Sequence, residues 1–487
     1  MKRIFLSTYI ALAVLLTAGC SKEFLDKTPP DRLPEEGFIN SDARALAVVN
    51  AAYIPLTSNN LFGNDNISLR LFDPPAGDVI LTAAISGQVF NRFAFSADDP
   101  HLMAFYSGLY EGVYRSNVVI ERVPPVEMDE TLKARYVGEA KFLRALYYFY
   151  LVSNWGDVPL FTKPFEKPED ALVAKSPMAD IYAVMISDLN DAINSLPVSY
   201  GANDLGRATQ GAAKSLLGKT YLYMKDYENA EKYLGEVIAS GTYGLMENFD
   251  HIINRNYENN KESIFEIQFA SAAAGATWNV SDAREYHNWP QVNGGSSELS
   301  PTQSIVDEFE PGDPRLDFSL FHYEGQPFAP ELTTSQLNLD TYKKSWSPTG
   351  YNIRKGQVPV LFINARGTNF PLIRYADVLL MYAEAANELN MRDEARNAVN
   401  QVRQRPSVNM PELTVAQTDT KEKMFDAIVH ERRVELAFEQ HRFSDLKRWE
   451  LADEELAYLG YTARHRYFPL PQLELDVNPN LVQIDGW

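Results

Sequence analysis

Cysteine is nearly absent from this chain of 487 residues, which contains only Cys20. A single thiol excludes a framework of disulfides within the chain. A protein of this length does not need one, because it can bury a core large enough for stability. Its hydrophobic residues, 45%, and charged residues, 23%, are those of an ordinary globular protein.

Positive charge is also scarce. The chain has 45 Lys and Arg residues against 65 Asp and Glu residues, which gives a formal net charge of −20. A protein that binds nucleic acid needs a basic surface to displace counterions from the phosphates. The charge balance therefore excludes nucleic acid as a partner.

No hydrophobic run is long enough to cross a membrane. The apolar stretch over residues 4–16 follows Lys2 and Arg3 and is shorter than the roughly 20 residues that span a bilayer. A basic start, a short apolar segment and the small residues at 17–19 are typical of a secretory signal. We therefore predict a signal peptide over residues 1–19.

Cys20 lies where cleavage is expected, and its setting resembles a lipobox, in which the cysteine thiol takes lipid and becomes the mature N-terminus. The lipobox pattern prefers Leu three residues earlier, where this chain has Thr17. Two or more acyl chains hold a protein stably on a membrane. We predict lipidation at Cys20 and a tether over residues 20–40, whose start at 21–23 resembles a surface-export tag. The alternative is an ordinary signal peptide with a chance cysteine.

The motifs of common enzymes are incomplete. Gly218-Lys219-Thr220 mimics the end of a phosphate-binding loop, but the required earlier glycine is Ala213. His430-Glu431 could begin a zinc-protease helix, but Val434 stands where the second histidine belongs. No G-x-S-x-G elbow or calcium-binding loop is present. We expect no cofactor, no metal and no catalysis, with surface hydrolysis as an alternative because paired carboxylates are plentiful.

Helix signals, in contrast, are frequent. Ser41 can cap a helix, and Asp99-Pro100 and Ser176-Pro177 combine a capping side chain with proline at the first turn. Apolar residues recur along one stripe from Tyr375 to Leu389. These signals predict helices over about 41–53, 100–122, 130–153, 177–196 and 374–389.

Two segments resemble tetratricopeptide repeats, which are helix–turn–helix units of about 34 residues. Both have the spacing of large and small residues that lets two helices approach closely. Their matching residues are Leu217, Gly218, Tyr221 and Ala230, and Tyr382, Ala383, Ala386 and Ala395. Because the two units lie far apart in the sequence, they do not form one uninterrupted tandem array.

The segment between the repeats, about 241–370, is rich in Gly, Pro, Asn and Ser and contains one short candidate strand, 261–269. A long irregular region in a compact protein is usually functional. The sequence therefore predicts an all-α fold, a tetratricopeptide-like helical-repeat scaffold with long irregular loop insertions and minor β content. We expect one domain over residues 41–487.

An ordered set of motifs spans essentially the whole chain. It resembles the SusD/RagB family of outer-membrane nutrient-binding lipoproteins. The motifs are Leu25-Asp26 before Pro29, residues 154–160 (NWGDVPL), 374–385 (RYADVLLMYAEA), 431–449 (ERRVELAFEQHRFSDLKRW), 468–471 (FPLP) and 478–480 (NPN).

The resemblance implies a surface lipoprotein that lies as a lid on a SusC-like TonB-dependent barrel and binds oligosaccharides or, less commonly, peptides. A protein-binding repeat scaffold is a further alternative. The matched motifs are interpreted as scaffold. Trp155 is expected to be a core anchor, and the charged residues of 432–442 are expected to form ion pairs along one helix.

Capture of a sugar requires exposed aromatic faces with polar groups beside them, and loops on a rigid scaffold are where such groups collect. Aromatic residues make up 12% of the chain, and they are dense with polar residues over 278–289. A second polar loop covers 70–91. The resemblance implies ligand contacts from loops in these two stretches. Our candidate ligand-binding residues are Trp278, Asn279, Tyr286, Trp289, Arg70 and Asp78, with Trp278, Tyr286 and Trp289 as an aromatic platform.

Overall fold

The structure is a computed structural model, and it describes residues 39–63, 67–82, 87–270, 284–290, 292, 295–327, 341–356 and 367–487. The predicted signal peptide, the predicted lipidation site at Cys20 and nearly all of the predicted tether lie outside these ranges. The boundaries between signal peptide, tether and a single domain therefore stay predictions.

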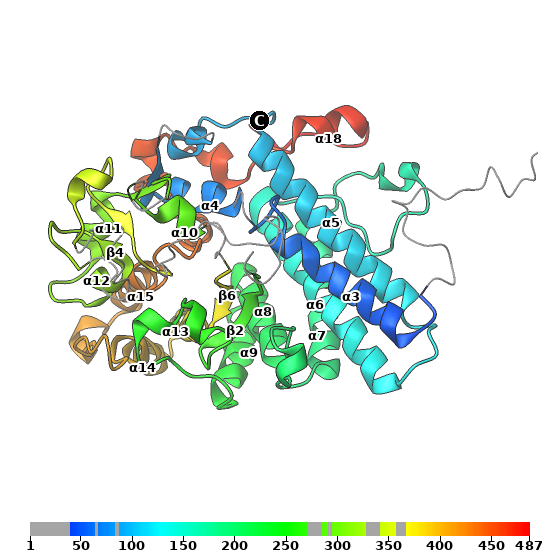
Figure 1. Cartoon of the computed structure of the whole chain (residues 1–487), viewed down its shortest axis with the longest axis horizontal. Helices are drawn as coiled ribbons and strands as arrows, with labels where there is room; N and C mark the ends of the chain where they lie inside the picture. Colours follow the sequence, from blue (N-terminus) through cyan, green and yellow to red (C-terminus); the bar gives the residue numbers. More distant parts are fainter. Residues whose placement is uncertain are drawn as a thin grey trace, which may run out of the picture.

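The long helices form a curved layer in which each packs against the next (Figure 1). None of the described helices is long and apolar enough to cross a membrane. The long helices are α3 (Asp42–Thr57), α5 (Pro100–Arg122), α6 (Glu130–Trp155), α7 (Met178–Ser195), α8 (Gln210–Tyr223), α9 (Tyr227–Ala239), α13 (Tyr375–Glu388), α14 (Arg392–Arg403) and α15 (Lys421–Glu435). This architecture confirms the predicted helical scaffold.

The ends of these helices follow local signals. The side chain of Asp99 accepts hydrogen bonds from the first free N–H groups of α5, and Pro100 is its first residue. Ser41 holds the N-cap position of α3, without a side-chain hydrogen bond. The helix predicted after Ser176 begins two residues later, with Pro177 in the N-cap position.

The two predicted repeat units are helix pairs, α8 with α9 and α13 with α14, and α9 packs directly on α13. A side-chain carbon added at Gly218 would lie 2.6 Å from Leu234, so only glycine allows this approach of α8 to α9. Between the units, Gly235 faces the ring of Tyr382. The repeats that the sequence separates are therefore neighbours in space, because the segment between them leaves the helical layer and returns to it.

The returning segment begins and ends as two strands of one small sheet. Strand β2 (Ser263–Ile267) pairs antiparallel with β6 (Phe370–Arg374), so the predicted strand near residue 265 is confirmed. Further strands are β1 (Val79–Leu81) with β3 (Leu299–Pro301), and β4 (Leu320–Phe321) with β5 (Asn352–Ile353). Short helices complete the fold: α4 (Ile67–Phe72), α10 (Arg284–Asn288), α11 (Gln303–Glu308), α12 (Arg315–Ser319), α16 (Arg442–Arg448), α17 (Ala452–Glu455) and α18 (Gln472–Val477).

The core contains Trp155, the last residue of α6. The Trp155 side chain is fully buried, and its Nε1 donates a hydrogen bond to the carbonyl oxygen of Pro469 at 2.9 Å. Its ring lies between Tyr106 and Phe468. Trp155 therefore anchors the C-terminal segment to the first helices, as the sequence predicted.

The ion pairs of the 431–442 segment differ from the prediction. Helix α15 ends at Glu435, so Glu439 and Arg442 lie outside it. The side chains reach other elements instead of one another: Arg432 binds Asp377 and Asp445, each at 2.9 Å. The expectation of ion pairs along one helix was wrong, because the segment is buried and its charges are matched by distant parts of the chain.

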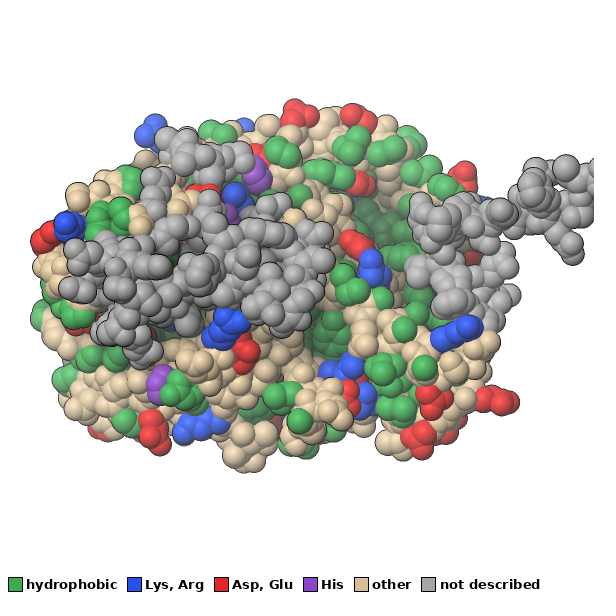
Figure 2. Space-filling model, in the orientation of Figure 1, with side chains coloured by type: hydrophobic (Ala, Val, Ile, Leu, Met, Phe, Trp, Pro, Cys, Tyr) green, Lys and Arg blue, Asp and Glu red, His purple; other side chains and the backbone are tan. Residues whose placement is uncertain are grey.

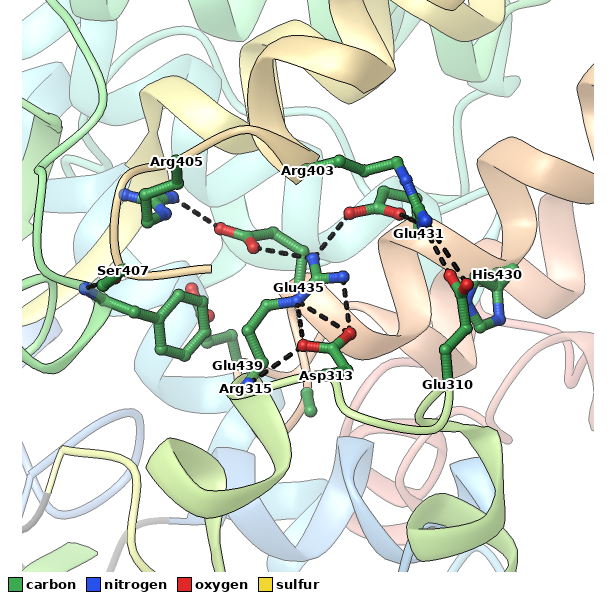
Figure 3. Close-up of polar contacts among 12 residues, drawn as sticks. Glu310, Asp313, Arg315, Arg403, Arg405, Ser407, His430, Glu431, Glu435 and Glu439 are labelled. Atoms are coloured by element: carbon green, nitrogen blue, oxygen red, sulfur yellow. Dashed lines mark hydrogen bonds and ion pairs between the residues drawn. The ribbon is translucent and has the colours of Figure 1, made fainter. Parts of the chain in front are cut away.

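In a second buried cluster, Glu435 accepts hydrogen bonds from Arg405 at 2.8 Å, Arg374 at 2.8 Å and Arg315 at 3.1 Å. Figure 3 shows Glu435 between Arg405 and Arg315. All four side chains are at most 2% exposed. Burial alone would raise the pKa of Glu435, but the three guanidinium groups hold it well below its usual range. The carboxylate therefore stays charged and joins α12, β6 and the end of α14 to α15.

Candidate functional site

The two loops that the sequence marks as ligand-binding candidates meet at strand β3. Strand β1, from the first loop, pairs with β3, and Thr82 N–H continues the ladder to the Glu298 carbonyl at 2.9 Å. From the second loop, the His287 carbonyl accepts a hydrogen bond from Glu298 N–H at 2.8 Å. Segments about 200 residues apart in the sequence thus share one edge of the molecule.

Glu298 also joins the loops through its side chain. Its carboxylate lies 3.6 Å from Arg70 Nη2 and pairs with the ring of His287. Burial would raise the pKa of Glu298, but the hydrogen bond and charge of His287, with the charge of Arg70, hold it below its ordinary value. The charged side chain of Glu298 therefore links the two loops through ion pairs.

Asp78 and Asp73 lie beneath this edge. Asp78 is 5% exposed, and Arg433 from α15 donates to its carboxylate at 2.7 Å. Asp73 is 6% exposed, and burial, with the negative charge of Asp78, raises its pKa to about 8. Asp78 thus ties the first loop to the helical scaffold, and the protonated Asp73 is too deep to reach a ligand.

The base of the second loop is closed by the end of the insertion. Before the loop, Phe269 N–H donates to the side-chain oxygen of Asn369 at 2.8 Å. After it, Arg284 donates to the carbonyls of Thr368 and Asn369 and lies 4.1 Å over the ring of Phe370. Phe269 and Arg284, on either side of the second loop's first part, are therefore both bonded to 368–370.

The structure divides the predicted aromatic platform. Trp278 and Asn279 lie outside the described residues, and so does the side chain of Tyr286, whose backbone belongs to α10. Trp289 is 6% exposed and packs in a small apolar cluster with Phe321 and Tyr342. Trp289 does not present a ring face to solvent. The prediction of an aromatic platform therefore rests on Trp278 and Tyr286.

Sequence reasoning missed Glu298 and Asn369, the residues that organise this edge. Neither lies in a recognisable motif, and their partners are distant in the sequence.

The residues of the incomplete enzyme motifs, at 218–220 and 430–431, make contacts within the scaffold. Lys219 lies 3.3 Å from Asp377, and His430 Nδ1 lies 2.7 Å from Glu308. No cluster of metal ligands occurs among the residues that the structure describes.

Comparisons with known proteins agree with this architecture. The model of the SusD family matches residues 261–464, and a model described as "Starch-binding associating with outer membrane" matches 23–222. A SusD-like protein of Bacteroides ovatus is 27% identical over an alignment of 490 positions, which covers 94% of this chain and 86% of the relative.

Solved structures show the same similarity. A SusD superfamily protein from Bacteroides vulgatus has a TM-score of 0.79 and 29% identity, covering 92% of this chain and 99% of that one. A laminarin-binding SusD-like protein has a TM-score of 0.75 and 28% identity, covering 92% and 100%. With two family models matching in sequence order and a shared fold along nearly the whole length, this chain belongs to the SusD family.

Proposed function

We propose that this protein is a lipid-anchored, cell-surface binding protein that captures an oligosaccharide and delivers it to a SusC-like TonB-dependent transporter of the outer membrane. A peptide ligand is the less favoured option. The observation that carries the proposal is membership in a family with starch- and laminarin-binding relatives. The meeting of two polar loops at one clamped edge supports it, because a rigid scaffold that positions loops is suited to binding.

The charge pattern favours binding over hydrolysis. A glycosidase needs a carboxyl group that holds a proton near neutral pH and reaches the substrate. Here Glu298 has a lowered pKa, and the protonated Asp73 is buried under the loops. Neither group meets both requirements, so these two carboxyl groups do not supply a general acid at the edge where the loops meet.

A binding screen of the purified protein against plant, host and microbial polysaccharides, and against peptides, tests the proposal. We expect binding to at least one glycan class with a dissociation constant between about 1 μM and 1 mM, and no cleavage products after hours of incubation. Release of shorter glycans would favour a hydrolase. Failure to bind any glycan, with no barrel protein co-purifying from outer membranes, would favour a protein-binding scaffold.

The aromatic platform is tested by alanine substitution. Trp278→Ala and Tyr286→Ala are each expected to weaken binding of the glycan found in the screen about tenfold, because each removes a ring that stacks on a sugar face. Trp289→Ala is expected to act mainly on thermal stability, since that ring is buried. Calorimetry beside thermal unfolding separates the two effects, and unchanged affinity in both the Trp278 and Tyr286 variants would reject the platform.

Lipidation at Cys20 is tested by Cys20→Ser. The variant is expected to be lost from the outer-membrane fraction, because acyl chains attached to the thiol would be the membrane anchor. Ser21→Ala is the matched control and should stay membrane-bound. Fractionation and protease treatment of intact cells measure both, and a Cys20→Ser protein that remains at the surface would contradict the anchor.

A further inference from the structure

A groove lies apart from the two loops, between α3, strand β2 and the segment 203–207. It consists of two adjoining hollows of about 230 Å³ each, which share Leu205, Gly206, Arg207, Phe265 and Glu266 as walls. Figure 2 shows hydrophobic side chains lining a recess near the middle of the face where Figure 1 places α3 and β2. We call these hollows the 205 groove.

The apolar part of the 205 groove is open to solvent. Leu205, which borders both hollows, is 55% exposed, and Val198, which borders the second, is 53% exposed. The rings of Tyr53 and Tyr200 line the first and second hollow, respectively. Each hollow therefore has an apolar rim and a tyrosine in its lining. The flat C–H face of a sugar can pack against such surfaces.

The charges in the 205 groove neutralise one another. Arg207 donates to Glu139 at 3.0 Å and to Asp204 at 2.7 Å, and Arg135 donates to Asp204 at 3.1 Å. Burial acts to raise the pKa of Asp204, but hydrogen bonds from the two arginines hold it below its usual value. The Asp204 carboxylate, 34% exposed, therefore stays ionised and can accept hydrogen bonds from hydroxyls. The charged residues that line the groove are Asp204, Glu266, Arg207 and Lys261, so two acidic side chains face two basic ones and the groove favours a ligand without net charge.

Neutral polar side chains complete the lining. Asn50, Asn203 and Gln268 are exposed at the first hollow. Asn50 uses its amide oxygen for Arg207, at 2.8 Å, so its amide hydrogens remain for a ligand. Side-chain amides, a fixed carboxylate and ring faces together match the hydroxyls and apolar faces of a sugar.

We propose that the 205 groove is a second binding site for a neutral oligosaccharide, with one sugar ring in each hollow. This inference rests on the proposed glycan-binding function. Along the chain the groove borders the base of the second loop, because Gln268 lines the groove and the next residue, Phe269, is bonded to Asn369.

The test compares the double variant Asn203→Ala/Leu205→Ala with Val415→Ala, whose side chain is 62% exposed and outside the groove. All three substitutions remove exposed side chains, so the fold should be retained, and thermal unfolding checks this. The probes are maltose-series and laminarin-series hexasaccharides and the corresponding disaccharides. We expect the double variant to bind the hexasaccharide about five- to tenfold more weakly, and Val415→Ala to match the unsubstituted protein.

Hydrogen exchange gives a second readout. The bound hexasaccharide should slow amide exchange in peptides covering 198–208 and 263–268 of the unsubstituted protein, and this protection should be lost in the double variant. If the protein binds a hexasaccharide but the double variant binds it equally and neither peptide is protected, the groove is not a glycan site while the proposed function stands. If neither series binds and the polysaccharide screen is also negative, both proposals are overturned.

Discussion

Replacing Glu435 by alanine is expected to lower the free energy of unfolding by about 3–5 kcal/mol. The substitution leaves Arg315, Arg374 and Arg405 without their shared carboxylate, and all three guanidinium groups are at most 2% exposed. Each arginine keeps another carboxylate partner, but the buried cluster loses a negative charge that compensates the desolvation cost of all three guanidinium groups. Chemical denaturation of the protein lacking the signal and lipid, followed by circular dichroism, measures the loss.

An exposed ion pair is the matched control. Lys225 and Glu450 lie 2.8 Å apart with side chains 53% and 63% exposed. Glu450→Ala should leave the midpoint of chemical denaturation nearly unchanged, because water screens the pair in the folded protein. If Glu435→Ala were as mild as Glu450→Ala, the four-residue cluster would not be the tie between helices that its burial indicates. If the alanine variant does not fold, Glu435→Gln, which keeps the shape, should show a smaller loss in the same direction.

Replacing Trp155 by alanine is expected to cost about 3–5 kcal/mol, because it empties a fully buried site of the largest side chain. It also removes the hydrogen bond to Pro469 and the ring contact with Phe468, which hold the C-terminal segment. We therefore expect faster proteolysis after residue 467 in addition to a lower melting temperature. Limited proteolysis with mass spectrometry identifies the cleavage site.

Trp155→Phe separates packing from the hydrogen bond. It keeps an aromatic ring but leaves the buried Pro469 carbonyl without its donor, so it should cost less than the alanine variant, about 1–3 kcal/mol. Tyr458→Ala is the control, since that ring is 69% exposed, and it should change stability by no more than about 0.5 kcal/mol. An alanine variant at position 155 with unchanged stability and no new cleavage would contradict the anchoring role.

Features governed by neighbouring residues were predictable from the sequence. The cap at Asp99, the apolar stripe from Tyr375 and the small residue at Gly218 each act within one or two helices, so their patterns identified α5, α13 and the α8–α9 pair. The burial of Trp155 was likewise expected. The pairing of β2 with β6 was not, because strands about 100 residues apart leave no local sign of their partner.

The sequence indicated the two loops of the candidate site, whereas the contacts between them came only from the structure. Composition identified the two polar loops, but it did not indicate that Glu298 would clamp them or that Asn369 would close the base of one. It also grouped Trp289 with Trp278 and Tyr286, although Trp289 is buried. Residue type shows which side chains suit a ligand, whereas exposure depends on what else packs against them.

The sequence alone determined the helical class, the positions of the repeat units and the predicted export signal with its single cysteine. These depend on periodicity and on residues close together along the chain. Only the tertiary structure decided that Glu435 binds three distant arginines, that the repeats touch across a long insertion, and that the 205 groove exists. Such contacts form only in the folded protein, where burial brings remote side chains together. Charges then find their partners, and separate segments line one groove.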